Sequence, residues 1–233
     1  MAEWRWFRGW STAALRARLE ALAAKTLNFG AVEEEMTSDR GWHHYQSDSV
    51  IARGADVDAQ FARAKTALAT YQFSDPSIVV AHFDPQAPLH LRRLLLEIKV
   101  WGLRYLCPAV VSRVRDEADV FAFRYDALDG HFEQGLEWFV LTKEVRGDIR
   151  FRIEARWMRG QFPNWWSRIG FMLLGGFYQR RWHRRAHQRL SRLAHFGSPH
   201  RPRRDAFGLT HQGVDVRFTY HRRRMRLLWP HER

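Results

Sequence analysis

Residues 123–139 read FRYDALDGHFEQGLEWF, and this stretch decides the fold. Asp129 and Gly130 lie at its centre, between two segments rich in aromatic residues. A two-residue type I′ turn needs positive φ at both central positions, and an Asp-Gly pair tolerates it. The stretch therefore predicts an antiparallel hairpin in which Leu128 lies opposite His131.

A second turn, expected at Arg146 and Gly147, fixes the register of the following strand. Counting from both turns, the predicted cross-strand pairs are Tyr125–Gln134, Phe123–Leu136, Phe121–Trp138, Val140–Ile153, Trp138–Ala155 and Leu136–Trp157. The shared aromatic face comprises Phe121, Phe123, Tyr125, Leu136, Trp138, Val140, Phe151, Ile153 and Trp157. On the other face Glu137 is expected opposite Arg156, a pair that contributes roughly 0.2–1 kcal/mol.

The chain on both sides of this hairpin continues with regular patterns. Strand-like segments bounded by turn residues are Trp42–Arg53, Ser77–Phe83, Leu94–Leu103, Ala109–Arg115, Asp119–Ala127, His131–Lys143 and Asp148–Met158. Apolar residues at helical spacing predict helices over Ser11–Lys25, Val57–Tyr71 and Pro163–His195. This order predicts an α+β fold in which a curved antiparallel β-sheet of about six to seven strands wraps a long C-terminal α-helix.

The chain length favours one domain. A chain of 233 residues can bury a single core without disulfides or metals. Residues 1–197 are expected to form one domain that includes the N-terminal helix, and residues 198–233 a basic C-terminal extension. Within that extension, residues 214–228 are expected either to add a strand or to remain mobile.

The net charge of +13 originates in the last third of the chain. Residues 1–159 carry 22 basic and 22 acidic side chains, whereas residues 160–233 carry 16 and 3. Such a cluster can bind a polyanion through counterion release. The candidate anion-binding residues on the last helix are Arg180, Arg181, Arg184, Arg185, Arg189 and Arg192. The alternative is compositional, because only four of the 38 basic residues are lysine, which indicates a chain-wide coding preference for arginine.

The sequence indicates a reducing compartment. Cys107 is the single cysteine and lies in an apolar stretch, so we expect a core residue, with no disulfide and no cysteine metal site. The first ten residues lack the apolar segment of a secretion signal, and Trp165–Tyr178 is too short to span a bilayer. The protein is therefore expected in the cytoplasm, with attachment to the inner membrane surface left open.

The predicted aromatic face has two interpretations. It packs on the last helix as an ordinary core, or it leaves a gap there that holds a small molecule. Residues expected to bind such a ligand are Phe121, Phe123, Tyr125, Leu136, Trp138, Phe151, Ile153, Trp157 and Phe177.

Candidate acid–base residues alternate along the strand after the Asp-Gly turn. His131, Glu133 and Glu137 share a face there, joined by Asp126 of the preceding strand. Catalysis would need a carboxyl group whose pKa is shifted toward neutrality. Since Glu137 is expected to pair with Arg156 on a solvated face, the sequence favours a structural role for this cluster and a protein that is not an enzyme.

Metal and cofactor sites are not predicted. His43 and His44 are adjacent in a strand and point to opposite faces, so they do not form a pair of metal ligands. The sequence has no glycine-rich phosphate loop, nucleotide fingerprint or serine-nucleophile elbow. We therefore expect no cofactor.

Several short stretches of the sequence resemble those of one known family. The stretches that carry the resemblance are LNFGAVE (27–33), GWHHYQ (41–46), FSDPSIV (73–79), FRYDALDGHFEQGLEWF (123–139) and FRIEARWMRG (151–160). They are similar to the bacterial and plant family called domain of unknown function nineteen-ninety, over about residues 8–195. The resemblance implies a START-like helix-grip fold and adds no catalytic residue.

Three functional hypotheses follow. The first is a non-catalytic START-like domain that binds an apolar or amphipathic small molecule between the sheet and the C-terminal helix. The second is a peripheral module that binds an anionic membrane or nucleic acid through the arginine-rich helix and tail. The third is a small-molecule enzyme that uses His131, Glu133 or Glu137.

Overall fold

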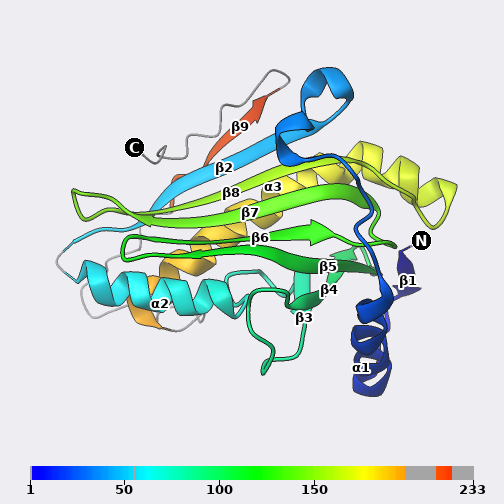
Figure 1. Cartoon of the computed structure of the whole chain (residues 1–233), viewed down its shortest axis with the longest axis horizontal. Helices are drawn as coiled ribbons and strands as arrows, with labels where there is room; N and C mark the ends of the chain where they lie inside the picture. The colour runs from blue at the N-terminus through cyan, green and yellow to red at the C-terminus, as the bar shows by residue number, and fades with distance from the viewer. Residues whose placement is uncertain (1, 55, 198–213, 222–233) are drawn as a thin grey trace.

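The computed structural model describes residues 2–54, 56–197 and 214–221, which form a curved antiparallel sheet and three α-helices (Figure 1). Within these ranges the sheet has nine strands in the order β3-β4-β5-β6-β7-β8-β2-β9, with β1 paired to β5. The strands are β1 (Glu3–Trp6), β2 (His43–Ala52), β3 (Val79–His82), β4 (Arg93–Val100), β5 (Leu103–Asp116), β6 (Val120–Ala127), β7 (Glu133–Lys143), β8 (Ile149–Arg159) and β9 (Arg217–His221).

The helices are α1 (Thr12–Ala21), α2 (Val57–Ala69) and α3 (Trp165–Phe196). Ser11 caps α1 as expected, since its Oγ accepts a hydrogen bond from the Ala14 N–H at 3.2 Å. Asn164 caps α3 through a 2.8 Å bond from the Ser167 N–H, so the predicted start at Pro163 was too early. Short 3-10 turns lie at Leu22–Ala24, Glu33–Glu35 and Ser38–Arg40.

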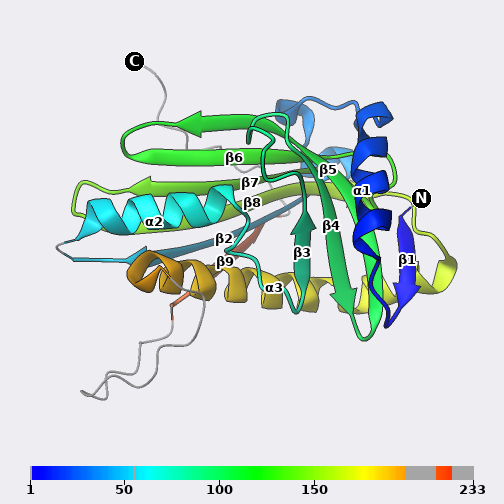
Figure 2. The ribbon, with the colours of Figure 1, turned by 90° about the horizontal axis from the view of Figure 1, so that it is seen from below.

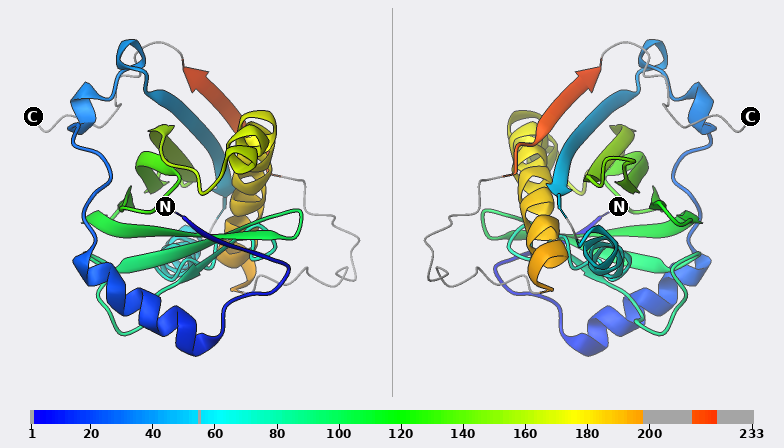
Figure 3. Two further views of the ribbon diagram at one scale, coloured as in Figure 1. Left: turned by 90° about the vertical axis from the view of Figure 1, so that its right-hand side faces the viewer. Right: turned by 90° about the vertical axis from the view of Figure 1, so that its left-hand side faces the viewer.

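The two faces of the sheet are covered by different parts of the chain. The inner face packs on α2 and α3, and the sheet curves around α3 (Figures 2 and 3). Phe73 and Phe139 meet the Trp182 ring there, with ring centroids 6.3 Å apart in both contacts. On the outer face α1 covers β4 and β5, and residues 29–42 cover β6 to β8. The predicted α+β fold, a curved antiparallel sheet gripping a long C-terminal helix, is confirmed.

The predicted register of the β6–β7 hairpin was wrong. The turn exists, because the His131 N–H donates to the Leu128 carbonyl at 2.9 Å, but Gly130 has positive φ and Asp129 does not, so it is not type I′. With respect to β6, residues 131–135 then form an irregular segment, although Glu133–Gly135 already pair with β8. Pairing with β6 starts at Asp126 opposite Leu136. The ladder pairs Phe123 with Phe139, a displacement of three residues from the prediction.

Gly135 makes this irregular segment possible. Its φ is +138°, and a Cβ atom there would lie 2.0 Å from the Arg156 carbonyl oxygen. The strand can approach β8 at this point only without a side chain.

The predicted register of the β7–β8 hairpin was also wrong, by one residue. The loop contains three residues between Glu144 and Asp148, because Gly147 adopts positive φ after a tight turn. This geometry is the common three-residue loop with a glycine bulge. Phe139 therefore pairs with Ile153, where Val140 was expected.

Both displacements are odd, so β7 presents the opposite face from the one predicted. Leu136, Trp138 and Val140 lie on the outer face, where they pack with Met36 and Trp42. Phe139 and Leu141 take their places in the inner core. The expected Glu137–Arg156 pair is absent from the ladder, because Arg156 lies opposite Leu136.

Two other boundaries differ from the prediction. Trp101 and Gly102 both have positive φ and form the tight turn between β4 and β5, so Leu103 begins β5 and does not end β4. Strand β1 was not predicted. Strand β9 lies in the predicted C-terminal extension and pairs with β2, and residues 198–213 and 222–233 of that extension lie outside the described residues.

An ion-pair network lies beneath residues 29–42 on the outer face. The Arg124 guanidinium, with 10% of its side chain exposed, donates to Glu33 Oε2 at 2.9 Å and to Asp126 Oδ2 at 2.8 Å. Trp138 Nε1 donates to the other Glu33 oxygen at 3.2 Å. Buried charges of this kind are tolerated because they are paired and hydrogen-bonded.

Candidate functional site

A cavity of about 590 Å³ lies between the inner face of the sheet and the first half of α3. Its wall is built from β2 to β8 on one side and from α3 on the other. Aromatic side chains predominate, among them Tyr45, Tyr71, Tyr105, Tyr125, Phe132, Trp157, Phe171 and Trp182. A mostly apolar cavity with a few polar groups is the usual form of a small-molecule site.

Two carboxyl groups face this cavity from β7. Glu133 and Glu137 line it because the irregular segment before Leu136 turns the odd-numbered residues of β7 inward. Glu137 is buried and accepts a short hydrogen bond from the Tyr125 hydroxyl. His183 Nε2 of α3 lies 3.5 Å from the other Glu137 oxygen.

Burial changes the protonation of these groups. It raises the pKa of Glu137 to about 7, against a smaller opposite effect of the Tyr125 hydrogen bond. Burial, aided by the charge of Glu137, raises the pKa of Glu133 to about 8. Burial also lowers the pKa of His183 to about 3 and that of His131 to about 4, so these histidines are neutral at pH 7 and do not act as counter-ions.

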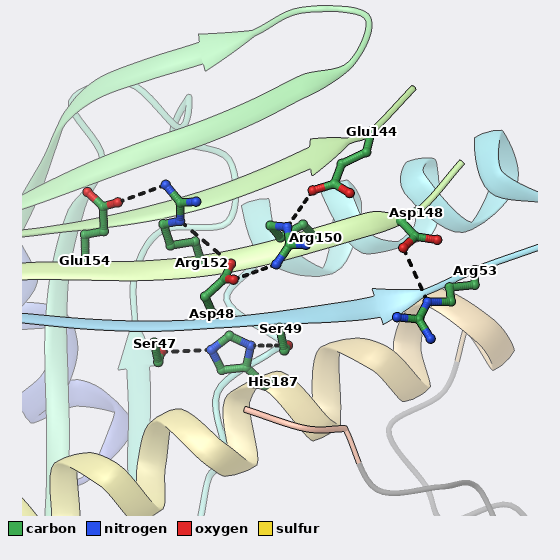
Figure 4. A network of polar contacts seen from close by, with 10 residues as sticks. All are labelled: Ser47, Asp48, Ser49, Arg53, Glu144, Asp148, Arg150, Arg152, Glu154 and His187. Carbon is green, nitrogen blue, oxygen red and sulfur yellow. Dashed lines mark hydrogen bonds and ion pairs between the residues drawn. The ribbon is translucent and has the colours of Figure 1, made fainter. Parts of the chain in front are cut away.

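A buried hydrogen-bonded chain runs from His183 along the contact between α3 and β2. His183 Nδ1 lies 2.7 Å from Ser47 Oγ, and Ser47 Oγ lies 2.8 Å from His187 Nε2. His187 Nδ1 ends the chain at Ser49 Oγ, 2.7 Å away (Figure 4). Each hydroxyl carries one proton, so the chain orients the His183 ring beside Glu137.

The opposite face of β2 has a separate ion-pair network. Asp48 points away from α3 and accepts from Arg150 at 2.6 Å. Glu144 binds the same arginine, and Glu154 binds Arg152 of β8 (Figure 4). This alternation isolates the histidine chain from the outer charges. His43 and His44 also alternate as predicted: His43 lines the cavity, whereas the His44 ring meets the Met36 carbonyl.

The structure distributes the predicted ligand-binding residues among four environments. Tyr125 and Trp157 line the cavity. The closed core contains Phe121, Phe123, Phe151 and Ile153. Leu136 and Trp138 lie on the outer face, because of the register, and Phe177 is 55% exposed on α3.

The predicted acid–base residues lie together. His131, Glu133 and Glu137 line the cavity, on the aromatic side of the sheet and not on the solvated side that was expected. Asp126 does not join them, because it binds Arg124 on the outer face. The sequence analysis missed His183. Its spacing with His187 and Leu190 along one face of the last helix is typical of buried positions.

The six candidate anion-binding arginines of α3 differ in their contacts and exposure. Arg185 binds Asp75 at 2.6 Å, and Arg189 donates to the Gln72 carbonyl at 2.5 Å. Arg184 lies over the Phe218 ring, 5.9 Å from its centroid, and Arg192 is half-buried. Arg180 and Arg181 are exposed, next to the cavity end of the helix.

An exposed apolar stripe follows the outer side of the first half of α3. Its members are Trp165, Ile169, Met172, Leu173 and Phe177, each more than two-fifths exposed. Arg168, Arg180 and Arg181 adjoin it, and the 32 residues of the helix include no acidic side chain. Among the described helices, none is long and apolar enough to cross a bilayer.

Comparisons with known proteins give one family. The family described as "Domain of unknown function (DUF1990)" matches residues 27–189. A UPF0548 protein of Deinococcus radiodurans is 29% identical over 138 residues, which cover 55% of this chain and 68% of that protein.

Solved structures are similar at low identity. A hypothetical protein of Helicobacter pylori has a TM-score of 0.43 and 12% identity, over 69% of this chain and 95% of that one. Human STARD10 has a TM-score of 0.37 and 8% identity, over 78% of this chain and 82% of that one.

Proposed function

The chain belongs to the family described as Domain of unknown function (DUF1990), and we propose that it binds an amphipathic small molecule in the cavity between the sheet and α3. The cavity itself carries this proposal. Its volume of about 590 Å³, its aromatic wall and its grouped polar atoms on β7 suit a ligand with one polar end. The closed core beside it needs no ligand, because Phe73, Phe123 and Phe139 already pack there.

Filling the cavity tests this proposal. Gly170 lines the cavity from α3, and a Cβ atom at this position would meet no atom within 4 Å. Gly170→Phe is expected to occupy the ligand volume and to improve the local helix propensity. Native mass spectrometry of protein purified without detergent should show a co-purifying compound on the wild type and none on this variant.

Gly30→Phe is the matched control, since Gly30 is exposed, lies outside the cavity and would likewise place a Cβ atom in open space. This variant should retain the compound. Two results would exclude the cavity as the binding site. One is that Gly170→Phe retains as much of the co-purifying compound as Gly30→Phe. The other is that this variant binds a lipid-like fluorescent dye with the same affinity as the wild type.

The exposed stripe of α3 favours a second candidate function, attachment to an anionic lipid surface. Apolar and aromatic residues beside arginine, on a helix without acids, are the pattern of an interfacial helix. The same half of α3 lines the cavity with its other side, so attachment would place the ligand site near the lipid. Nucleic acid is less well matched, because it offers no apolar phase for Leu173 and Phe177.

Vesicle binding tests the second candidate. Leu173→Ser with Phe177→Ser should abolish co-sedimentation with vesicles of phosphatidylcholine and phosphatidylglycerol. Arg180→Gln with Arg181→Gln should weaken it about 30-fold, from roughly 1 kcal/mol per arginine. Val145→Ser, which removes an exposed apolar side chain far from α3 in sequence, should have no effect. Binding to DNA without binding to vesicles would contradict the proposal.

A further inference from the structure

We propose that the polar end of the ligand is a protonated amine, held between Glu133 and Glu137 on the inner face of β7. This inference rests on the proposed function and narrows it to one ligand class, amphipathic organic cations. Three observations support it. Among the described residues, Glu133 and Glu137 have no cationic partner, hydrogen-bond acceptors lie around them, and the cavity wall is aromatic.

The first step concerns the partners of the two carboxyl groups. Among the described residues, no hydrogen bond or ion pair reaches the Glu133 side chain, and Glu137 has only Tyr125 as a close donor. Arg159 lies directly opposite Glu133 in the ladder, but its guanidinium is directed to Met172 Sδ, 3.6 Å away. The cavity therefore contains two acids that its own cations leave unpaired.

Among the described residues, no cation of the cavity wall forms an ion pair with Glu133, and the imidazole near Glu137 is the neutral His183. The ionisable groups of the wall besides the two acids are His43 on β2, His131 before β7, Arg159 on β8, Arg180 and His183 on α3, and several tyrosine hydroxyls. Neutral His131 and His183 provide no positive charge near pH 7, and Arg159 and Arg180 are exposed. Glu137 is buried and Glu133 is half-buried, and an unpaired carboxylate shielded from water is costly, so a cationic ligand would be favoured there.

The second step concerns geometry. Glu133 and Glu137 lie four residues apart on β7, which keeps one continuous register with β8 between them, and both side chains line the same cavity. The Tyr71 hydroxyl lines the same cavity and, among the described residues, has no hydrogen-bond partner. A primary ammonium group has three N–H donors, and these two carboxyl groups with Tyr71 offer three acceptors.

The third step concerns the surrounding rings. Tyr45, Tyr71, Tyr125 and Trp182 line the cavity together with Glu137. Aromatic faces attract organic cations by about 0.5–2 kcal/mol, and more strongly where water is excluded. An alkyl or aryl portion of the ligand would then extend along the apolar wall formed by α3.

Three probes of equal chain length test the inference by isothermal titration calorimetry: decylamine, decanol and decanoate. Decylamine should bind wild-type protein at least about tenfold more tightly than decanol, which corresponds to one charge-assisted contact. Glu137→Gln and Glu133→Gln should each remove this preference while decanol binding is retained. Glu154→Gln, the same change on the outer face of β8, is the control and should leave the preference intact.

Proton release gives an independent readout. At pH 7 the two carboxyl groups are partly protonated, and an ammonium group favours their ionised forms. Decylamine binding should therefore release protons, detected as a dependence of the binding enthalpy on the buffer, and its affinity should rise from pH 6 to pH 8. Decanol should show neither effect.

The outcomes separate this inference from the proposed function. Binding of decanol and decylamine with equal affinity, abolished by Gly170→Phe, would retain the cavity as a ligand site and overturn the amine. Stronger binding of decanoate would overturn it as well. If none of the three probes binds up to its solubility limit, the proposed function itself fails for simple amphiphiles, and the inference fails with it.

Discussion

Arg124→Met is expected to lower the free energy of unfolding by about 3–5 kcal/mol. The Arg124 guanidinium is the common partner of the Glu33 and Asp126 carboxylates beneath residues 29–42. Methionine preserves the length of the side chain but leaves two buried carboxylates without their strongest partner. Urea denaturation followed by circular dichroism measures the loss, with an unchanged m-value as the sign that the folded state is otherwise intact.

Arg115→Met provides the matched control. Arg115 pairs with Glu117 at the surface, where Glu117 is 51% exposed, and such pairs contribute about 0–1 kcal/mol. Adding Glu33→Gln and Asp126→Asn to Arg124→Met should recover part of the lost stability, because the uncompensated charges are then removed. A loss below about 1 kcal/mol for Arg124→Met would show that this network is hydrated and not buried.

Glu137→Gln is expected to stabilise the ligand-free protein, and to do so more at high pH. The carboxyl group of Glu137 has a pKa of about 7 in the folded state and an ordinary value of 4.5. Between these values the folded protein binds more protons than the unfolded chain, so stability falls as the pH rises through this window. The cost to the wild type is on the order of 3 kcal/mol at about pH 8 and on the order of 1 kcal/mol at about pH 5.

Denaturation of both proteins at the two pH values measures this difference. The buried histidines contribute in the opposite direction: burial holds their pKa low, so their stabilising effect is lost as the pH falls below about 6.5. They are present in wild type and variant alike and cancel in the comparison. Glu154→Gln again serves as the control on the outer face. A Glu137→Gln gain that does not depend on pH would contradict buried ionisation as its cause.

Much of the fold could be predicted from local patterns. Ser11 marked the start of α1, the apolar spacing of residues 57–71 marked α2, and turn residues marked the strands of the meander. Strand β1 escaped detection because it has only four residues, too few for the alternation of charged residues with Trp4 and Trp6 to be recognised as a strand. The β4–β5 turn escaped because Trp101 adopts positive φ, which is rare for a bulky residue.

The register could not be derived from turn dipeptides. An Asp-Gly pair is compatible with several turn types, and only the packing of β7 against β8 near Gly135 selects the irregular segment that follows. The prediction was nevertheless self-consistent, because both neighbours of β7 were displaced by an odd number of residues. Strands β6 and β8 thus kept the correct faces, and their agreement concealed the inversion of β7.

The candidate site, too, could be predicted only in part. The alternation of His131, Glu133 and Glu137 indicated that the three residues share one side of the chain, and all three line the cavity. Whether these side chains are buried could not be predicted, because their burial depends on which face of the sheet α3 covers. Tyr71 and His183 reach the cavity from distant segments, and only the tertiary structure brings them to β7.

The alternation of inward carboxyl groups and outward apolar side chains along β7 limits how the 131–135 segment can change in length during evolution. Deleting a single residue from the 131–135 segment would either strain that segment or shift β7 by one residue, and the shift would bring carboxyl groups into the layer now filled by Trp138 and Leu136. Removing or adding two residues keeps the alternation in phase. Natural length variation between Gly130 and Leu136 should therefore favour even steps.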